Sequence, residues 1–259
     1  MKKSKIAELV AMVVVLAFSL AACGGSDKSS SDKTVYKVGT EPTFPPFDTT
    51  DEDQNIVGLD MDLIKAIGED QGFDVEFENL SFDGLIPALK AGNIDIVAAG
   101  MNKDDEDRQK EVDFSDSYYE SKLFVAVTED NTTIKSVEDL TPDMKVAAQT
   151  GTTGASKVQE LKDAGKIKEA VILDGLDTCM MKLINGDVSA VINDKPVTEA
   201  YMKKQPDKIK MVGEALNAEN YGFAVQKGNA ELVEKINNGL KNIKENGTYD
   251  KLVDEWFNK

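Results

Sequence analysis

The spacing of apolar residues along 34–100 alternates between two periods. A β-branched run at 36–40 and an alternating run at 75–78 are typical of strands. Leu59, Leu63 and Ile67 recur at helical spacing, and Gly72 ends this helix. In chain order, the pattern predicts a strand at 36–40, a helix at 58–72, a strand at 75–78, a helix at 81–90 and a strand at 94–99.

The same alternation of strands and helices begins again after residue 129. Strands that alternate with helices predict parallel pairing, because each helix returns the chain to the start of the next strand. The predicted elements are strands at 145–148, 171–173, 188–192 and 221–225, a glycine turn at 151–154, and helices at 155–164, 177–185, 194–204, 230–246 and 249–257.

We therefore expect an α/β protein of two lobes, each a mostly parallel sheet flanked by helices. Residues 34–128 and 218–259 form lobe 1 in this prediction, and residues 129–217 form lobe 2. The chain crosses between the lobes at 122–129 and at 216–225, and two such connections favour a hinge. Ligands of open α/β sheets bind beyond the carboxyl ends of the strands, which places a ligand in the cleft between the lobes. The alternative is two lobes packed permanently together.

The first residues have the pattern of a secretion signal. A start rich in lysine precedes an apolar run at 9–20, which is shorter than the ~20 residues of a membrane span. We predict a signal peptide at 1–22, with an uncleaved membrane anchor as the alternative. The segment 20–23 resembles the lipobox of bacterial lipoproteins, which implies that Cys23 is lipidated. The small and polar residues at 23–33 predict a flexible tether.

Composition restricts the chemistry. The formal net charge of −17 disfavours nucleic-acid binding, because an acidic protein repels phosphate backbones. The chain has no histidine, which removes the commonest general base and the commonest metal ligand. Cys179 is the single cysteine after Cys23, and we expect a small core residue there rather than a nucleophile. We therefore expect no catalytic residue, no metal and no cofactor.

Short motifs in a fixed order add a family resemblance. The chain resembles the family-3 extracellular solute-binding proteins, which are the polar amino-acid receptors of ABC importers, over roughly residues 35–258. This resemblance implies a two-lobe fold of the periplasmic-binding-protein type. The segments that carry it are 41–47, 58–63, 82–89, 95–101, 108 with 112–116, 149–154, 193–194, 246–249 and 256–257.

The resemblance and simple electrostatics point to the same residues for the two charges of an amino acid. Arg108 would bind the α-carboxylate, since its planar fork of donors suits a carboxylate better than lysine does. Asp194 would bind the α-ammonium, with the Gly100 carbonyl and the Asn102 side chain as partners from lobe 1. Asn102 stands where the family generally has Ser or Thr, and the segment before Arg108 is one residue longer than usual. The alternatives are a solvated Arg108 and an Asp194 that caps a helix.

The turn at 151–154 and two aromatic residues complete the expected site. The N–H groups of a helix start favour an anion, and the resemblance implies that Thr153, beside Thr152, closes on the carboxylate from lobe 2. A plain glycine turn with a capping threonine is the alternative. Phe44 and Phe82 match the aromatic positions that enclose the aliphatic part of the ligand, although either could be a core residue.

Two further positions bear on which amino acid is bound. Glu41 and Gln149 occupy positions where relatives contact the far end of the ligand. A carboxylate there favours a basic or amide side chain over an acidic one.

The predicted function is capture of a free amino acid outside the cell and its delivery to an ABC permease. We expect a monomer, anchored in the lipid bilayer through Cys23 at the outer face of the cytoplasmic membrane. One alternative is a sensor or adhesin lipoprotein with the same fold. Another is an enzyme similar to cyclohexadienyl dehydratase, which would need an extra carboxylic acid in the cleft. No such acid is apparent in the sequence.

Overall fold

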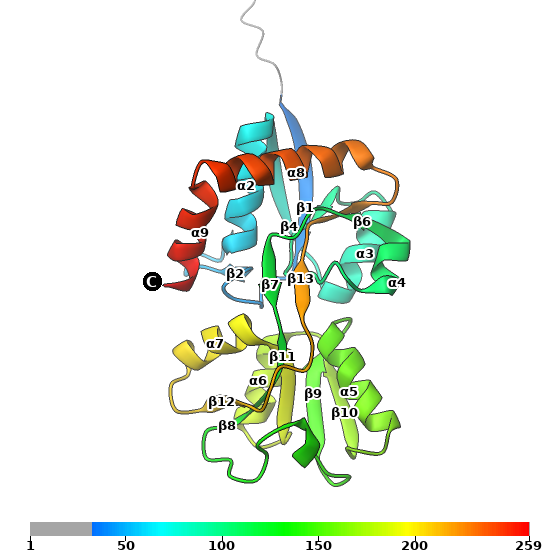
Figure 1. Ribbon diagram of the computed structural model, residues 1–259, viewed down its shortest axis with the longest axis vertical. Helices are drawn as coiled ribbons and strands as arrows, with labels where there is room; N and C mark the ends of the chain where they lie inside the picture. Colours follow the sequence, from blue (N-terminus) through cyan, green and yellow to red (C-terminus); the bar gives the residue numbers. More distant parts are fainter. Residues whose placement is uncertain (1–32, 259) are drawn as a thin grey trace, which may run out of the picture. The chain divides into compact units, whose positions relative to one another are not determined.

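The computed structural model describes residues 33–258 (Figure 1). The predicted signal peptide, the predicted lipidation site Cys23 and most of the predicted tether lie outside the described residues. Within 33–258, no helix combines the length and the apolar character needed to cross a membrane.

The first lobe is built on a five-stranded sheet of order β4-β1-β5-β14-β6. The pairs β4–β1 and β1–β5 are parallel, whereas β14 runs antiparallel to both of its neighbours. The strands are β1 (Thr34–Thr40), β4 (Phe73–Asn79), β5 (Ile96–Val97), β6 (Val112–Phe114) and β14 (Ala224–Gln226), and a small hairpin adds β2 (Thr49–Thr50) and β3 (Ile56–Val57).

The second lobe repeats this plan in the order β10-β9-β11-β8-β12. The pairs β10–β9 and β9–β11 are parallel, and β8 runs antiparallel to both β11 and β12. In each sheet, therefore, one strand runs against the other four. The strands are β8 (Leu123–Thr128), β9 (Lys145–Gln149), β10 (Glu169–Leu173), β11 (Ala190–Asp194) and β12 (Ile209–Val212).

Two short strands join the lobes. Strands β7 (Tyr119–Ser121) and β13 (Glu219–Tyr221) pair antiparallel and lie side by side between the two sheets (Figure 1). We call them the hinge pair. Each leads within a few residues into the one strand that runs against its sheet, β8 or β14, because the chain enters each lobe from the side of the other lobe.

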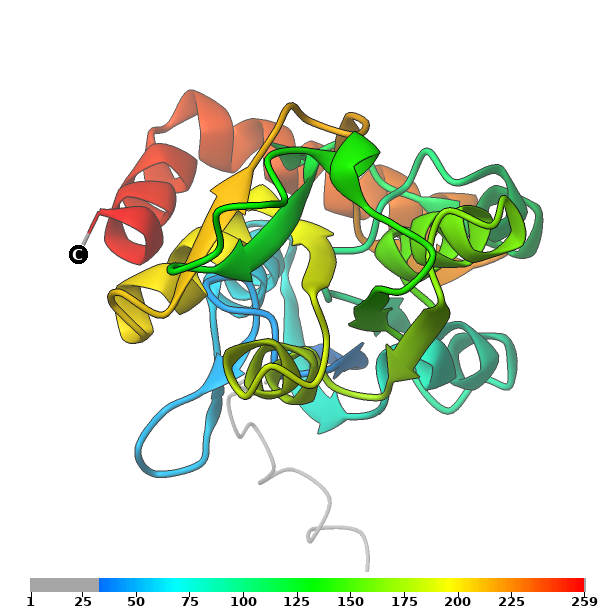
Figure 2. The same ribbon diagram turned by 90° about the horizontal axis from the view of Figure 1, so that it is seen from below.

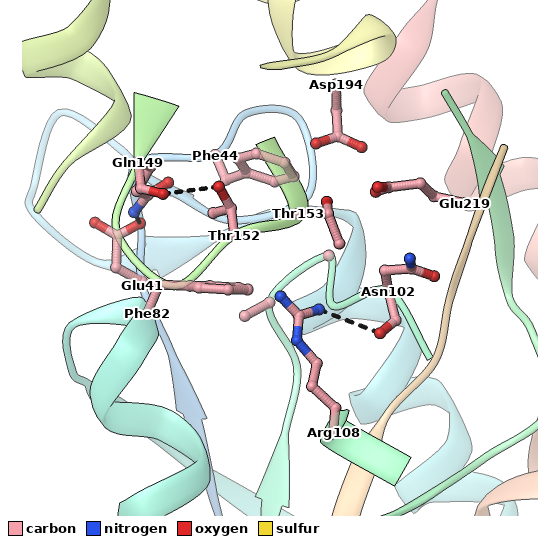
Figure 3. Close-up of a pocket in the computed structure, with 12 residues that line it drawn as sticks. Glu41, Phe44, Phe82, Asn102, Arg108, Gln149, Thr152, Thr153, Asp194 and Glu219 are labelled. Atoms are coloured by element: carbon pink, nitrogen blue, oxygen red, sulfur yellow. Dashed lines mark hydrogen bonds between the residues drawn. The ribbon is translucent and has the colours of Figure 1, made fainter. Parts of the chain in front are cut away.

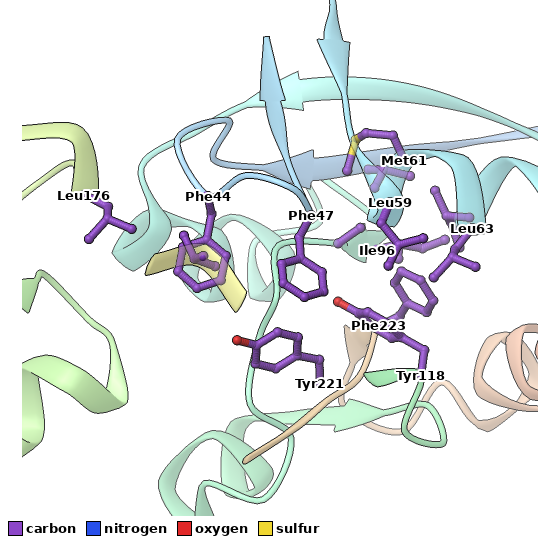
Figure 4. Close-up of a cluster of buried hydrophobic side chains, with 14 of the residues drawn as sticks. Phe44, Phe47, Leu59, Met61, Leu63, Ile96, Tyr118, Leu176, Tyr221 and Phe223 are labelled. Carbon is purple, nitrogen blue, oxygen red and sulfur yellow. The ribbon is translucent and has the colours of Figure 1, made fainter. Parts of the chain in front are cut away.

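Each sheet is covered on both faces, and the alternation of side chains along the strands divides the core accordingly. In lobe 2, Ala147 and Val191 belong to one apolar cluster, whereas their neighbours Val146 and Ile192 belong to another. Figure 4 shows part of the larger cluster, which is rich in aromatic rings. The helices are α2 (Leu59–Gln71), α3 (Phe82–Lys90), α4 (Glu106–Glu111), α5 (Thr153–Asp163), α6 (Leu176–Ile184), α7 (Lys195–Lys204), α8 (Ala230–Glu245) and α9 (Thr248–Phe257), with a 3-10 turn η1 (Val137–Asp139).

The predicted fold class is confirmed, although some elements differ from the sequence pattern. Helix α2 ends as predicted at Gly72, which has a positive φ of 76°. The strand predicted at 221–225 is divided, because the chain leaves the hinge pair before it joins the first sheet. Residues 123–128 pair in the second sheet as β8, so the change of lobe comes earlier than the expected boundary at 129.

A buried carboxyl group supports the loop that carries the site in lobe 1. Asp60 in α2 is fully buried, and its Oδ2 accepts hydrogen bonds from the Gly100 N–H (2.8 Å) and the Tyr118 hydroxyl (2.7 Å). Its Oδ1 has no partner among the described residues. Burial raises the pKa of Asp60 to about 7, against the lowering effect of these two hydrogen bonds.

This raised pKa predicts a pH-dependent stability. The folded state holds the Asp60 proton more tightly than the unfolded state, so its contribution to stability is lost as pH rises from about 4 to above 7. The loss is on the order of 4 kcal/mol. In Asp60→Asn the loss of stability between pH 5 and pH 8, measured by urea unfolding, should be smaller than in wild type, because only the other buried acids still titrate. The exposed control Asp53→Asn should behave as wild type. Equal slopes in wild type and Asp60→Asn would contradict the assignment.

Candidate functional site

A small pocket lies between the two lobes. It brings together all ten residues that the sequence predicts for the site, together with two that it does not predict (Figure 3). Their role in binding stays a prediction. The lining residues are Glu41, Phe44, Phe82, Ala99, Gly100, Asn102, Arg108, Gln149, Thr152, Thr153, Asp194 and Glu219.

The topology explains why these residues meet. Glu41 follows β1, Gly100 follows β5, Gln149 ends β9 and Asp194 ends β11. The carboxyl ends of these four strands face the cleft. Loops there can carry polar groups without interrupting the sheets. The pocket is therefore built from the same end of both sheets.

Arg108 is the cation of the pocket, and it comes from lobe 1. It lies in α4, whose N-cap Asp105 accepts hydrogen bonds from the Asp107 and Arg108 N–H groups. The guanidinium is 9% exposed and stacks on Phe82, with 5.4 Å from Cζ to the ring centre. The alternative of a solvated arginine is therefore wrong, and burial lowers the pKa of Arg108.

The guanidinium donates hydrogen bonds to both lobes, but its partners are backbone carbonyl groups and not a carboxylate. Nη1 donates to the Asn102 carbonyl (3.2 Å) and Nη2 to the Gly151 carbonyl of lobe 2 (2.9 Å). Within residues 33–258, Arg108 forms no salt bridge with a carboxylate. A buried charge held only by carbonyl groups leaves capacity for an anionic partner.

Asp194 is the matching anion from lobe 2. It occupies the N-cap position of α7, but its side chain makes no capping hydrogen bond, so the capping alternative is wrong. Its Oδ1 instead accepts hydrogen bonds from Ser121 (2.9 Å) and Tyr221, one from each strand of the hinge pair. Burial, and then the nearby charge of Glu219, raise the pKa of Asp194 well above its usual range.

The sequence pattern misses two residues of the pocket, Ala99 and the acid Glu219. Glu219 begins β13 in the hinge pair and is 2% exposed. Its Oε1 accepts a hydrogen bond from Asn217 Nδ2 (3.0 Å), and Asn217 Oδ1 accepts from the Leu123 N–H (3.1 Å). The extra acid that the sequence does not reveal is therefore present. The sequence offers one signal for Glu219. It lies in the predicted crossing at 216–225, which runs beside the cleft.

The two threonines at the start of α5 have different roles in the structure. Thr152 caps the helix, since its Oγ1 accepts from the Ala155 N–H (3.0 Å) and donates to the Gln149 carbonyl (2.7 Å). Thr153 is the first helical residue and lines the same pocket. The capping alternative thus holds for Thr152, and Thr153 is the threonine free to meet a ligand.

Glu41 and Gln149 meet at another side of the pocket. Gln149 Nε2 donates to Glu41 Oε2 (3.0 Å) and to the Asp174 carbonyl (3.0 Å), and Thr43 donates to both Glu41 oxygens (2.8 Å each). Burial raises the pKa of Glu41, and the hydrogen bonds from Gln149 and Thr43 act against this. The Glu41–Gln149 bond joins lobe 1 to lobe 2.

The aromatic residues are divided between the pocket and the core. Phe44 lies against Gly100, where an added Cβ would stand 2.7 Å from its ring. Gly100 also has a positive φ of 54°, so this position requires glycine for both reasons. Phe82 packs against the guanidinium, whereas Phe47 is fully buried in the core (Figure 4).

The pocket is closed in this structure. Its free volume is about 10 Å³, which holds at most one water molecule. On the far side of the cleft, the Tyr201 hydroxyl of α7 donates to the Thr43 carbonyl (3.1 Å) and Lys203 donates to the Phe257 carbonyl (2.8 Å). A ligand of amino-acid size can therefore enter only when the lobes separate and these groups rearrange.

Other chemistry finds little support in the described residues. Cys179 is fully buried, and burial raises its pKa to about 12, so the thiol is unreactive. No three acidic or cysteine side chains within 33–258 are grouped to hold a metal ion.

The threonine assignment predicts a clear difference in stability. Thr152→Ala removes the helix cap and should lower the free energy of unfolding by about 1 kcal/mol. Thr153→Ala, its matched control one residue away, should unfold close to wild type in urea. Equal losses in both variants would show that the cap is wrongly assigned.

Comparisons with known proteins identify the family to which the chain belongs. The family model described as bacterial extracellular solute-binding proteins, family 3, matches residues 36–259. A probable histidine-binding protein of Neisseria gonorrhoeae is 33% identical over 260 residues, which cover 97% of this chain and 95% of the relative.

Solved structures extend the likeness. An ancestral arginine-binding protein bound to arginine is 44% identical, with a TM-score of 0.82 and coverage of 87% of this chain and 99% of that one. The corresponding structure bound to glutamine gives 45% identity, a TM-score of 0.80 and coverage of 88% and 99%. An ancestral amino acid-binding protein, a precursor of cyclohexadienyl dehydratase, is 38% identical, with a TM-score of 0.79 and coverage of 86% and 95%. The chain therefore belongs to the bacterial extracellular solute-binding proteins of family 3.

Proposed function

We propose that this protein captures a free amino acid with a basic or amide side chain outside the cell and delivers it to an ABC import permease. One observation carries the proposal. A buried guanidinium of lobe 1 and a buried carboxylate of lobe 2, Arg108 and Asp194, line one pocket, and neither has a salt-bridge partner among the described residues. A guanidinium and a carboxyl group held apart across a cleft are complementary to the carboxylate and the ammonium of a small zwitterion.

The α-carboxylate of the ligand would replace the Gly151 carbonyl on Arg108 and accept from the Thr153 hydroxyl. Asn102 Oδ1 already accepts from the Asp104 and Asn220 N–H groups (3.1 and 3.2 Å), which leaves Nδ2 as a donor to the carboxylate. The family resemblance implies that Asn102 is a partner of the α-ammonium, whereas in this proposal it binds the α-carboxylate. Charge-assisted hydrogen bonds of this kind contribute roughly 1.5–3 kcal/mol each.

The α-ammonium would bind Asp194, with the Gly100 carbonyl as a partner from lobe 1. The ligand side chain would then run between Phe44 and Phe82 towards Glu41 and Gln149. A buried carboxylate at that end stabilises a cationic or amide group and repels an acidic one. Relatives and neighbours named for histidine and arginine, and a neighbour bound to glutamine, support this range.

Closure would convert binding into a signal for transport. A ligand that bridges Arg108 and Thr153 favours the closed state over the open one. A groove of about 790 Å³ lies between α7 and the C-terminal helix α9, which Figures 1 and 2 place near each other. Residues of both lobes line this groove, among them Pro196 and Trp256. A surface shared between lobes exists only when they are together, so a permease can use it to select the loaded form. We further propose a monomer, anchored through lipidated Cys23 at the outer face of the membrane.

A sensor or adhesin role would use the same binding chemistry, and an adjacent permease gene would argue against it. A dehydratase is the second candidate, because Glu219 supplies the cleft acid that this chemistry needs and one neighbour is a precursor of such an enzyme. Turnover of a prephenate-like acid would identify it. We propose that the protein is not an enzyme, since the pocket residues account for ligand binding without any bond being broken.

Isothermal titration with the common amino acids tests the ligand class. We expect binding of arginine, lysine, histidine or glutamine, and weak or no binding of aspartate and glutamate. Glu41→Gln should lower the affinity for cationic ligands by about tenfold or more, because the neutral amide no longer balances their charge. Glu52→Gln, an exposed control, should change nothing. Tight binding of aspartate or glutamate without arginine, lysine or glutamine would refute the assignment.

Arg108→Lys tests the carboxylate end separately. Lysine keeps the charge but cannot form two parallel hydrogen bonds, so affinity should fall at least about tenfold for every amino acid that binds. Lys110→Arg, an exposed substitution in the same helix, is the control. An unchanged affinity in Arg108→Lys would remove Arg108 from the binding site.

A further inference from the structure

The binding carboxylate of lobe 2 is held by the hinge rather than by its own lobe alone. Ser121 and Tyr221, which donate to Asp194 Oδ1, belong to the two strands of the hinge pair. Neither donor carries a positive charge. The carboxylate is 6% exposed, so it is stabilised by two hydroxyl groups instead of by water or a cation.

A second carboxylate faces the same space. Glu219 lies on the hinge strand β13, is buried like Asp194 and lines the same pocket, and its charge raises the pKa of Asp194. Figure 3 shows both side chains turned into the pocket from neighbouring elements. Asn217 holds one Glu219 oxygen in place at 3.0 Å. Two buried carboxylates this near to each other cannot both be charged without a cation or a proton between them.

The charged and titratable groups that face Asp194 are few. Glu219 and the Tyr221 phenol come from the hinge strand β13, and the Arg108 guanidinium faces it from lobe 1. Burial raises the pKa of the Tyr221 phenol well above its usual range, so it stays protonated and acts as a donor. Arg108 is engaged by carbonyl groups and makes no ion pair with either acid. The second negative charge is therefore balanced by a proton.

We propose that Glu219 and Asp194 together form the ammonium-binding site, and that capture of an amino acid expels one proton from this pair. The inference rests on the proposed function. The proton leaves the carboxyl oxygen of Asp194 for the solvent, and the N–H donors of the ligand ammonium take its place between the two carboxylates. No bond other than this O–H bond breaks, and the total charge is conserved.

The proposal assigns a role to Glu219 that packing alone does not give. Its negative charge keeps the proton on Asp194 in the free protein and then stabilises the ammonium in the complex. Binding should therefore strengthen as pH rises, by about tenfold per pH unit over the acidic range in which Asp194 holds its proton. A ligand with no ammonium group should neither release the proton nor show this dependence.

Calorimetric titration of the whole protein with arginine, in two buffers of different ionisation enthalpy, counts the protons released. The chain has no histidine, so few ordinary groups titrate near pH 6. The count of released protons is therefore less obscured by other groups. We expect the wild type to release about one proton for each arginine bound. Glu219→Gln should release clearly less, and its affinity should depend less on pH.

Two further variants separate the sources of the proton. Glu41→Gln removes the other buried acid of the pocket and should keep the release, because the proton comes from Asp194. Glu120→Gln changes an exposed acid on the hinge strand β7 and should match the wild type. Thermal unfolding of each variant identifies any that fail to fold, and the wild-type count alone still tests the proposal.

The outcomes distinguish this inference from the proposed function. Arginine binding with no proton released by the wild type near pH 6 would overturn the inference and leave the function standing. An unchanged release in Glu219→Gln would do the same. If no amino acid binds at any pH, the proposed function itself fails.

Discussion

The structure depends on an electrostatic imbalance inside its cleft. Arg108 and Asp194 are both almost fully buried, and neither forms a salt bridge within residues 33–258. Burying a charge without an opposite partner is costly, and a protein that keeps such groups generally uses them. Here the two groups come from different lobes, so a ligand that bridges them in the proposed binding mode would also hold the lobes together.

The fold delivers those charges because its sheets end at the cleft. Glu41, Gln149 and Asp194 lie at or just after the carboxyl end of a strand, and Arg108 lies in helix α4, which follows β5. The hinge pair then contributes more than a connection. Ser121 and Tyr221 of this pair donate hydrogen bonds to Asp194, and Glu219 lines the same pocket, so in the proposed binding mode ligand capture and lobe movement would act on the same few atoms.

The sequence predicts much of this arrangement because the apolar periods are strong and the family motifs follow one another in a fixed order. Helical spacing in α2 and the glycine after it place that helix correctly, and the motif order brings all ten predicted residues to one pocket. The hinge is where the pattern fails. Strand β8 continues directly from a crossing strand, and no periodic signal marks where one lobe ends.

Side-chain roles were also beyond the sequence wherever one residue type suits two tasks. Threonine can cap a helix or bind an anion, and only the hydrogen bonds separate Thr152 from Thr153. Aspartate can cap or bind an ammonium, and only the direction of the Asp194 side chain decides. Glu219 has no motif around it, since its importance comes from the pairing of two strands far apart in the chain.

Ligand analogues measured by titration calorimetry test the central claim most directly. Agmatine is arginine without its α-carboxylate, and the deamino analogue is arginine without its α-ammonium. The account predicts that both bind far more weakly than arginine, that Arg108→Lys costs little further affinity for agmatine, and that Asp194→Asn costs little further affinity for the deamino analogue. Agmatine or the deamino analogue binding as tightly as arginine would contradict it.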